Sequence, residues 1–104
     1  MTPDQILEQQ IIMAISTVED PEIPVNIYEL GLIYDIGISK TRDVDITMTL
    51  TSPNCPVAES LPEEVRTKVA NLSDVSSCKV NIVFEPTWNA NYMSDEAKLE
   101  LGML

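Results

Sequence analysis

The side chains of residues 44–51 alternate between apolar and polar without interruption. The apolar positions are Val44, Ile46, Met48 and Leu50, and the polar positions are Asp45, Thr47, Thr49 and Thr51. Side chains of a β-strand point to opposite faces with a period of two, so this segment predicts a strand with one face on a hydrophobic core. A sheet built around such a strand needs cover on one face only.

Two other segments carry apolar residues at helical spacing. The first begins with a capping box at residues 2–5, and we expect it to end near Glu19, because Pro21 disfavours helical backbone at the residue before it. The second extends over residues 57–72, where Pro62 indicates a kink or a restart of the helix.

Residues 32–39 and 79–85 are predicted to form two further strands. The polar residues 40–43 would join the first of these to the alternating strand as a hairpin, and Ser94 would cap a short last helix. In the third strand the predicted core positions are Val80, Ile82 and Phe84. The order α-β-β-α-β-α favours an α+β fold, a small two-layer domain with a mixed three-stranded sheet and helices packed on one face. With 104 residues and a hydrophobic share of 44%, we expect one core and one domain over residues 1–104.

Acidic residues dominate the charge of the chain. Asp and Glu number 17, against 6 Lys and Arg, and the formal net charge is −11. Phosphate backbones and anionic lipids need a basic surface, so no nucleic acid and no membrane is expected as a partner. The acidity fits the solubility of the chain, and the alternative is docking onto basic protein partners. The first residues lack the basic stretch of a secretion signal and no apolar run has the length of a membrane span, so we expect a cytoplasmic protein.

Histidine is absent, and the chain has two cysteines, Cys55 and Cys78, which form no CxxC motif. The lack of histidine excludes Ser-His-Asp and Cys-His catalytic pairs and every zinc site that contains histidine. Two thiolates cannot supply the four that an all-cysteine iron–sulfur cluster needs, so a cluster would require a second subunit, oxygen ligands or a partner protein. We expect a protein that is not an enzyme, although chemistry on carboxylates, Cys, Lys or Tyr stays open.

Cys55 lies in the turn between the alternating strand and the second helix, flanked by two prolines. The N-terminus of a helix favours a thiolate, and Thr51 and Ser52 place hydroxyl groups nearby in the sequence. This pattern predicts a reactive or metal-binding cysteine, and the alternative is a small buried core residue. Cys78, at the start of the third strand, fits a structural role.

Two other groups of residues are candidates for binding. Asp20 and Glu22 flank Pro21, and this rigid turn would hold a carboxylate pair that binds metal, orients a thiol or meets a partner. The alternative is that the two residues are solvated loop charges or helix caps. Trp88, the one tryptophan, would either pack beneath a loop or provide an aromatic contact for a partner.

Residues 20–34, residues 49–56, and residues 85–88 followed by 96–102 carry three ordered motifs. Together they resemble the SufT-like and PaaD-like metal–sulfur cluster assembly family, which includes the small subunit of the eukaryotic cytosolic iron–sulfur targeting complex. The resemblance implies an α+β fold and a part in iron–sulfur cluster maturation of the SUF type, and not turnover of a metabolite.

The resemblance also implies one surface site at which Asp20, Glu22, Thr51, Ser52 and Cys55 gather. Cys55 would be the metal ligand there, and the cargo would be iron or a transient iron–sulfur cluster. Assembly proteins and client apo-proteins are the expected partners, and a homodimer that shares ligands between two copies is compatible with such a site.

Three interpretations of function stay open at this point. The chain is a carrier or scaffold that works through Cys55, a metal-free adaptor that docks the assembly machinery to client apo-proteins, or a thiol-dependent enzyme with Cys55 as the reacting group. Replacing Cys55 by alanine distinguishes the second interpretation from the other two.

Overall fold

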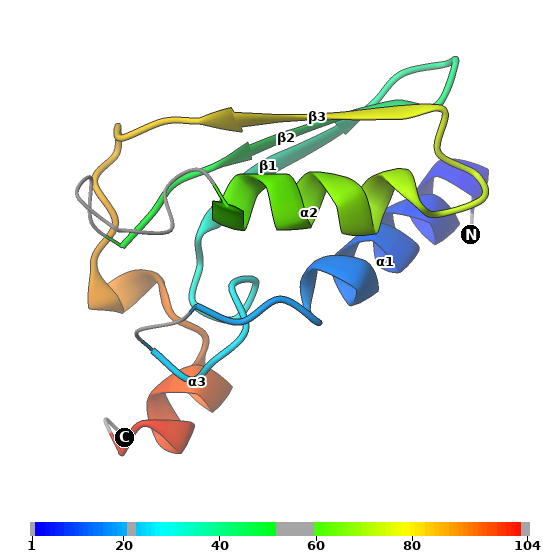
Figure 1. Cartoon of the computed structure of the whole chain (residues 1–104). Coiled ribbons are helices and arrows are strands. Elements are labelled where there is room, and N and C mark those ends of the chain that lie inside the picture. Colours follow the sequence, from blue (N-terminus) through cyan, green and yellow to red (C-terminus); the bar gives the residue numbers. More distant parts are fainter. Residues whose placement is uncertain (1, 21–22, 52–59, 103–104) are drawn as a thin grey trace.

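The computed structural model describes residues 2–20, 23–51 and 60–102 of the chain (Figure 1). The elements are α1 (Pro3–Ile15), β1 (Ile33–Ile38), β2 (Asp43–Met48), α2 (Ser60–Ala70), β3 (Ser77–Ile82), the 3₁₀ helix η1 (Ala90–Tyr92) and α3 (Asp95–Glu100). Apart from η1, this is the predicted order α-β-β-α-β-α, so the α+β fold class is confirmed.

The three strands form a mixed sheet in the order β1-β2-β3. β1 and β2 are antiparallel, whereas β2 and β3 are parallel, with α2 as the crossover between them. In Figure 1, α1 and α2 lie on the same side of the sheet. In the register, Ile46 lies between Ile36 and Val80, which pack with it in the core, while Asp45 pairs with Lys79 on the other face. The prediction of a sheet covered on one face is confirmed.

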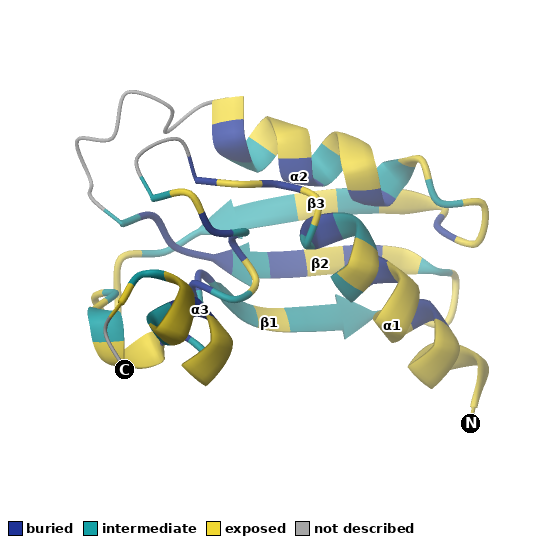
Figure 2. Cartoon of the chain, turned by 90° about the horizontal axis from the view of Figure 1, so that it is seen from below, coloured by how far each residue is buried: buried dark blue, intermediate teal, exposed yellow. Residues whose placement is uncertain are grey.

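The hydrophobic core lies between the covered sheet face and the two longer helices (Figure 2). Each helix contributes three buried side chains at a spacing of four residues, which keeps them on one helix face. The buried residues of α1, α2 and β2 are Leu7, Ile11, Ile15, Leu61, Val65, Val69, Val44, Ile46 and Met48. Burial of each such side chain contributes about 1.5–3 kcal/mol, so this stripe fixes how the helices lie on the sheet.

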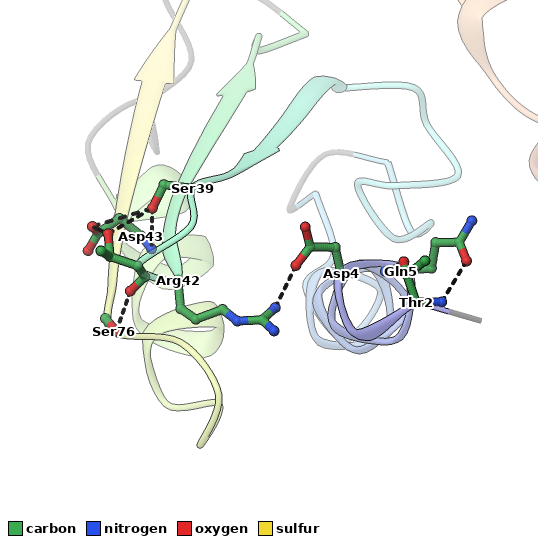
Figure 3. Close-up of polar contacts among 8 residues, drawn as sticks. Thr2, Asp4, Gln5, Ser39, Arg42, Asp43 and Ser76 are labelled. Carbon is green, nitrogen blue, oxygen red and sulfur yellow. Dashed lines mark hydrogen bonds and ion pairs between the residues drawn. The ribbon is translucent and has the colours of Figure 1, made fainter.

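The start of α1 is held at the turn between β1 and β2 (Figure 3). Thr2 and Gln5 form the predicted capping box: each accepts a hydrogen bond from the other's backbone amide, at 3.2 Å and 2.9 Å. In the turn, Arg42 has a φ of 65° and its guanidinium contacts the Asp4 carboxylate at 2.8 Å. An exposed ion pair contributes less than about 1 kcal/mol, so the contact mainly orients the turn. The predicted hairpin is confirmed.

The prediction for the end of the first helix is wrong, because α1 ends at Ile15 and not near Glu19. The hydroxyl groups of Ser16 and Thr17 donate to carbonyls of the last turn, at 2.8 Å and 2.7 Å, which competes with further helix. Val18 nevertheless stays fully buried, because its backbone pairs with a later loop.

The strand ends also differ from the prediction. β2 ends at Met48 and β3 ends at Ile82, so Phe84 lies beyond the sheet and is 45% exposed instead of facing the core. Thr49 was assigned to the polar face but is 1% exposed. Its amide donates to the carbonyl of Leu32 at 2.9 Å, so the residue just before β1 lies beside this end of β2.

The second helix begins at Ser60, so Pro62 falls in its first turn, where a missing amide costs no helical hydrogen bond. The part of the predicted helix before Ser60 lies outside the described residues, so the choice between a kink and a restart at Pro62 stays a prediction. No helix in the described ranges has the length and hydropathy to cross a bilayer.

Candidate functional site

The five residues of the predicted site fall into two groups. Asp20 and Thr51 belong to the described part of the chain, whereas Glu22, Ser52 and Cys55 lie outside it. The structure therefore tests the setting of one carboxylate and one hydroxyl, and the part of the site centred on Cys55 stays a prediction.

Asp20 is a buried carboxylate, with 3% of its surface exposed. Its Oδ1 accepts a hydrogen bond from the Ile23 amide at 3.2 Å, and its own amide donates to the Val25 carbonyl at 3.3 Å. The side chain is thus tied to the backbone of the third residue after it in the sequence. The interpretation as a solvated loop charge is therefore wrong for Asp20, and for Glu22, outside the described residues, it stays open.

Backbone hydrogen bonds connect the Asp20 turn with the chain just beyond β2. The Thr49 amide donates to the Leu32 carbonyl at 2.9 Å, and the Leu32 amide donates to the Ile27 carbonyl at 3.1 Å. The Ile27 amide donates in turn to the Val18 carbonyl at 2.9 Å, two residues before Asp20. These bonds place the two described site residues at the same end of the molecule, away from the N-terminus (Figure 1).

Thr51 has an unusual hydroxyl group. The residue is half-buried, and its Oγ1 is fully buried and makes no hydrogen bond within the part of the chain that the structure describes. A buried polar group without a partner costs about 1–3 kcal/mol. Such a cost is expected where a group serves a ligand or cargo instead of the fold.

Trp88 belongs to a segment that packs against the loop before β1. Its indole Nε1 donates to the Leu30 carbonyl at 2.7 Å, and its ring is half-buried against the core. Gly31, which follows Leu30, has a φ of 80°, and a Cβ there would lie 2.3 Å from the Tyr92 carbonyl oxygen. The interpretation of Trp88 as packing beneath a loop is confirmed, and its role as a partner contact stays a prediction.

Sequence reasoning did not single out the tyrosines of this region. The Tyr34 hydroxyl donates to the Pro86 carbonyl at 2.7 Å, and its ring meets the Tyr92 ring edge to face with centroids 6.0 Å apart. Burial raises the pKa of the Tyr34 phenol, and the phenol of Tyr92 adds to this. Gly31, inside a motif otherwise rich in apolar residues, was the one signal in the sequence for this close approach.

Cys78 lies at the second position of β3, and its thiol is half-buried. Burial raises the pKa of this thiol to about 11, and the carboxylate of Asp45 acts in the same direction against Arg66. A thiol with such a pKa stays protonated and unreactive near neutral pH. The expected structural role of Cys78 agrees with this setting.

The described residues supply few potential ligands for a metal ion. Within residues 2–20, 23–51 and 60–102, no three His, Cys, Asp or Glu side chains converge in a way that could hold a metal ion. Asp20 and Thr51 can supply oxygen atoms, and a thiolate would have to come from Cys55. One sulfur ligand with oxygen ligands suits weak and exchangeable binding of Fe(II).

The chain is similar to a known protein family and to named bacterial proteins. Residues 8–82 match the model of the family described as "Iron-sulfur cluster assembly protein". The chain is 50% identical over 97 residues to the "Fe-S protein maturation auxiliary factor" of Porphyromonas gingivalis, covering 93% of this chain and 92% of the relative. It is 40% identical over 100 residues to the Bacillus subtilis "Fe-S protein maturation auxiliary factor YitW", covering 96% and 98%.

Solved structures agree with the sequence relatives. A domain of unknown function from Bacillus anthracis, solved by crystallography, superposes with a TM-score of 0.89 at 35% identity and covers 96% of this chain and 95% of its own. The resemblance found in the three sequence motifs is confirmed. The chain belongs to the iron–sulfur cluster assembly protein family.

Proposed function

We propose that this protein assists the maturation of iron–sulfur proteins as a non-catalytic carrier or scaffold, working in the cytoplasm through a site centred on Cys55. The maturation role rests on relatives named as Fe-S protein maturation auxiliary factors that match this chain over nearly their whole length. The observation that supports the site is the pair of buried polar groups, the Asp20 carboxylate and the Thr51 hydroxyl, at one end of the molecule.

The cargo of such a site would be iron or a transient iron–sulfur cluster. Cys55 would supply the sulfur ligand, and Asp20, Glu22, Thr51 and Ser52 would supply oxygen atoms or hydrogen bonds around it. Four thiolates are needed for an all-cysteine cluster, so a whole cluster would also take ligands from a partner protein or from a second copy of this chain. A weak ligand set favours a factor that passes its cargo on.

A metal-free adaptor is the second candidate function. It is favoured by the lack of a three-ligand group within the described ranges and by the net charge of −11, which suits docking to basic proteins. In this case the partners are still assembly proteins and client apo-proteins, but Cys55 carries nothing. A thiol-dependent enzyme is a weaker third candidate, because no histidine is present to serve as a base.

Complementation of a deletion strain separates these functions. The gene is deleted, and the activity of an iron–sulfur enzyme is measured in extracts after wild type, Cys55→Ala or Cys78→Ala is supplied. We expect wild type and Cys78→Ala to restore the activity and Cys55→Ala to fail at equal protein level. Full rescue by Cys55→Ala would favour the metal-free adaptor over the carrier. Normal enzyme activity in the deletion strain under iron limitation would overturn the maturation role.

A further inference from the structure

β1 is an edge strand whose outer side is open. It lies at one end of the strand order, and the backbone hydrogen bonds of residues 33–38 go to β2 alone within the described part of the chain. Most of its residues are half-buried, and none is fully buried. An exposed edge of this kind is a template for another strand, since its outward amides and carbonyls have no partner.

Two grooves meet along this edge and share Ile33 and Tyr34. The first has a volume of about 590 Å³ and is lined mainly by aromatic and apolar side chains. The second has a volume of about 240 Å³ and lies between β1 and α1. We call both together the β1 groove, and its residues used below are Glu8, Tyr28, Ile33, Tyr34, Asp35 and Tyr92.

The β1 groove combines tyrosines with carboxylates. All three tyrosines of the chain line it, and Tyr28 and Tyr92 are 37% and 39% exposed. Tyrosine is enriched in protein interfaces, and its ring face attracts Lys and Arg. Glu8 and Asp35 are exposed at the second groove, and neither forms an ion pair within the described residues.

The other edge of the sheet differs in each of these respects. β3 presents Lys79 on its exposed positions, a residue that protects strand edges in many proteins and repels a basic segment. The two grooves described above take none of their described lining residues from β3. Edge position alone therefore does not single out β1; the tyrosines and carboxylates do.

We propose that the β1 groove binds a basic, extended segment of a partner protein, which adds to the sheet as a strand beside β1. Main-chain hydrogen bonds to the edge would give affinity, and alternate side chains would give specificity, with apolar ones on the tyrosines and Lys or Arg near Glu8 and Asp35. The charge of this chain favours such a partner over a second copy, because two copies would each bring a net charge of −11 to the contact. The identity of the partner depends on the proposed role in maturation, whereas binding of a basic strand at the β1 groove does not.

The test uses an eight-residue peptide of alternating Lys and Val with blocked ends, added to the full chain at low salt. We expect saturable shifts of backbone amide signals at residues 33–38 and near Tyr28 and Tyr92, and slower hydrogen exchange of the β1 amides with β3 unchanged. The matching peptide of alternating Glu and Val should not bind. Shifts of equal size on β3, or a β1 that exchanges as before, would overturn the inference.

Paired variants separate a local site from the general charge of the chain. Glu8→Gln with Asp35→Asn should weaken binding of the Lys–Val peptide about 3- to 10-fold. Glu64→Gln with Glu100→Gln changes the net charge equally at exposed positions away from the groove and should weaken it less than about 2-fold. Equal weakening by both pairs would reduce the binding to non-specific attraction and overturn the site.

Two further measurements keep this inference distinct from the proposed function. Cys55→Ala should bind the peptide as wild type does, because the proposed contacts use the described residues Glu8, Asp35 and the three tyrosines and not the thiol of Cys55. Chain mass in solution, measured by light scattering, should be that of a monomer without peptide. If the chain is a dimer and Asp35→Arg dissociates it, the β1 edge binds a second copy and the inference is overturned. That outcome would leave the proposed function intact if Cys55 is essential for maturation.

Discussion

The two ends of the molecule are stabilised in different ways. The end that holds α1, α2 and most of the sheet relies on regular apolar stripes, such as Leu61, Val65 and Val69 on one helix face. The end that holds Asp20 and Thr51 is built from irregular chain, fixed by individual backbone hydrogen bonds and by the close approach of Gly31 to Tyr92. The first end supplies stability, whereas the second buries a carboxylate, Asp20, and a hydroxyl, Thr51, that has no hydrogen-bond partner among the described residues. This contrast is typical of a scaffold that carries a site.

The largest expected effect lies at the regular end. Ile46 is fully buried in the central strand, so Ile46→Ala removes apolar contacts and leaves a cavity. We expect a loss of about 2–5 kcal/mol in the free energy of unfolding, measured by denaturant titration. Ile6→Ala, at a 45% exposed position of α1, is the control and should cost less than about 0.5 kcal/mol. Similar costs at both positions would contradict the assigned core.

Gly31→Ala tests whether the irregular end depends on a few close contacts. Its left-handed backbone costs alanine about 1–2 kcal/mol, and the new Cβ would also collide with the Tyr92 carbonyl. Gly102 has a similar φ of 74°, but no atom of the described residues lies within 4 Å of a Cβ added there, so Gly102→Ala should show only the backbone cost. We expect the Gly31 variant to be clearly the less stable of the two in thermal unfolding. Equal melting temperatures would mean that the C-terminal segment moves away without cost.

The regular end could be predicted from sequence, because its signals are local. The alternation at residues 44–51 and the helical stripe of α1 gave the correct layers and element order. The end of α1 was missed because Ser16 and Thr17 bind back to the helix and Val18 pairs with a distant loop. Those pairings depend on contacts between residues far apart in sequence, which no local pattern encodes.

The candidate site shows the same division. Its members came from the motifs, but neither the burial of Asp20 nor the buried Thr51 hydroxyl, which has no partner among the described residues, is visible in the local sequence. Trp88 could be assigned to packing in advance, because a lone tryptophan usually packs, whereas its bond to Leu30 could not. Local sequence therefore names such residues, and tertiary structure decides their state.

Thr51→Val is a smaller change that separates stability from function. Valine keeps the shape of threonine and removes a buried hydroxyl that has no partner within the described residues, so the free energy of unfolding should stay level or rise by up to about 1 kcal/mol. If the hydroxyl serves the site, maturation activity in the complementation assay should fall although the protein is no less stable. Thr67→Val, at an exposed position of α2, is the control. A stable Thr51→Val with full activity would assign the hydroxyl no role.

The smallest expected effect concerns the thiol of Cys78, which belongs to the regular end. Because burial raises its pKa to about 11, little thiolate exists at pH 8, and Cys55→Ala should react with iodoacetamide at least about tenfold more slowly than free cysteine.

The raised pKa of Cys78 also makes stability depend on pH. Its contribution to the free energy of unfolding is present below the ordinary value of 9.0 and is lost as the pH rises towards 11, since the unfolded thiol ionises first. Cys78→Ala should remove that part of the pH dependence, measured by denaturant titration across this range.

The two cysteines can also be compared directly. Cys78→Ala, which keeps Cys55, should react with iodoacetamide faster than Cys55→Ala does at pH 8. Equal rates for the two variants would mean that Cys55 is no more reactive than the structural cysteine, and that the predicted site has no specially reactive thiol.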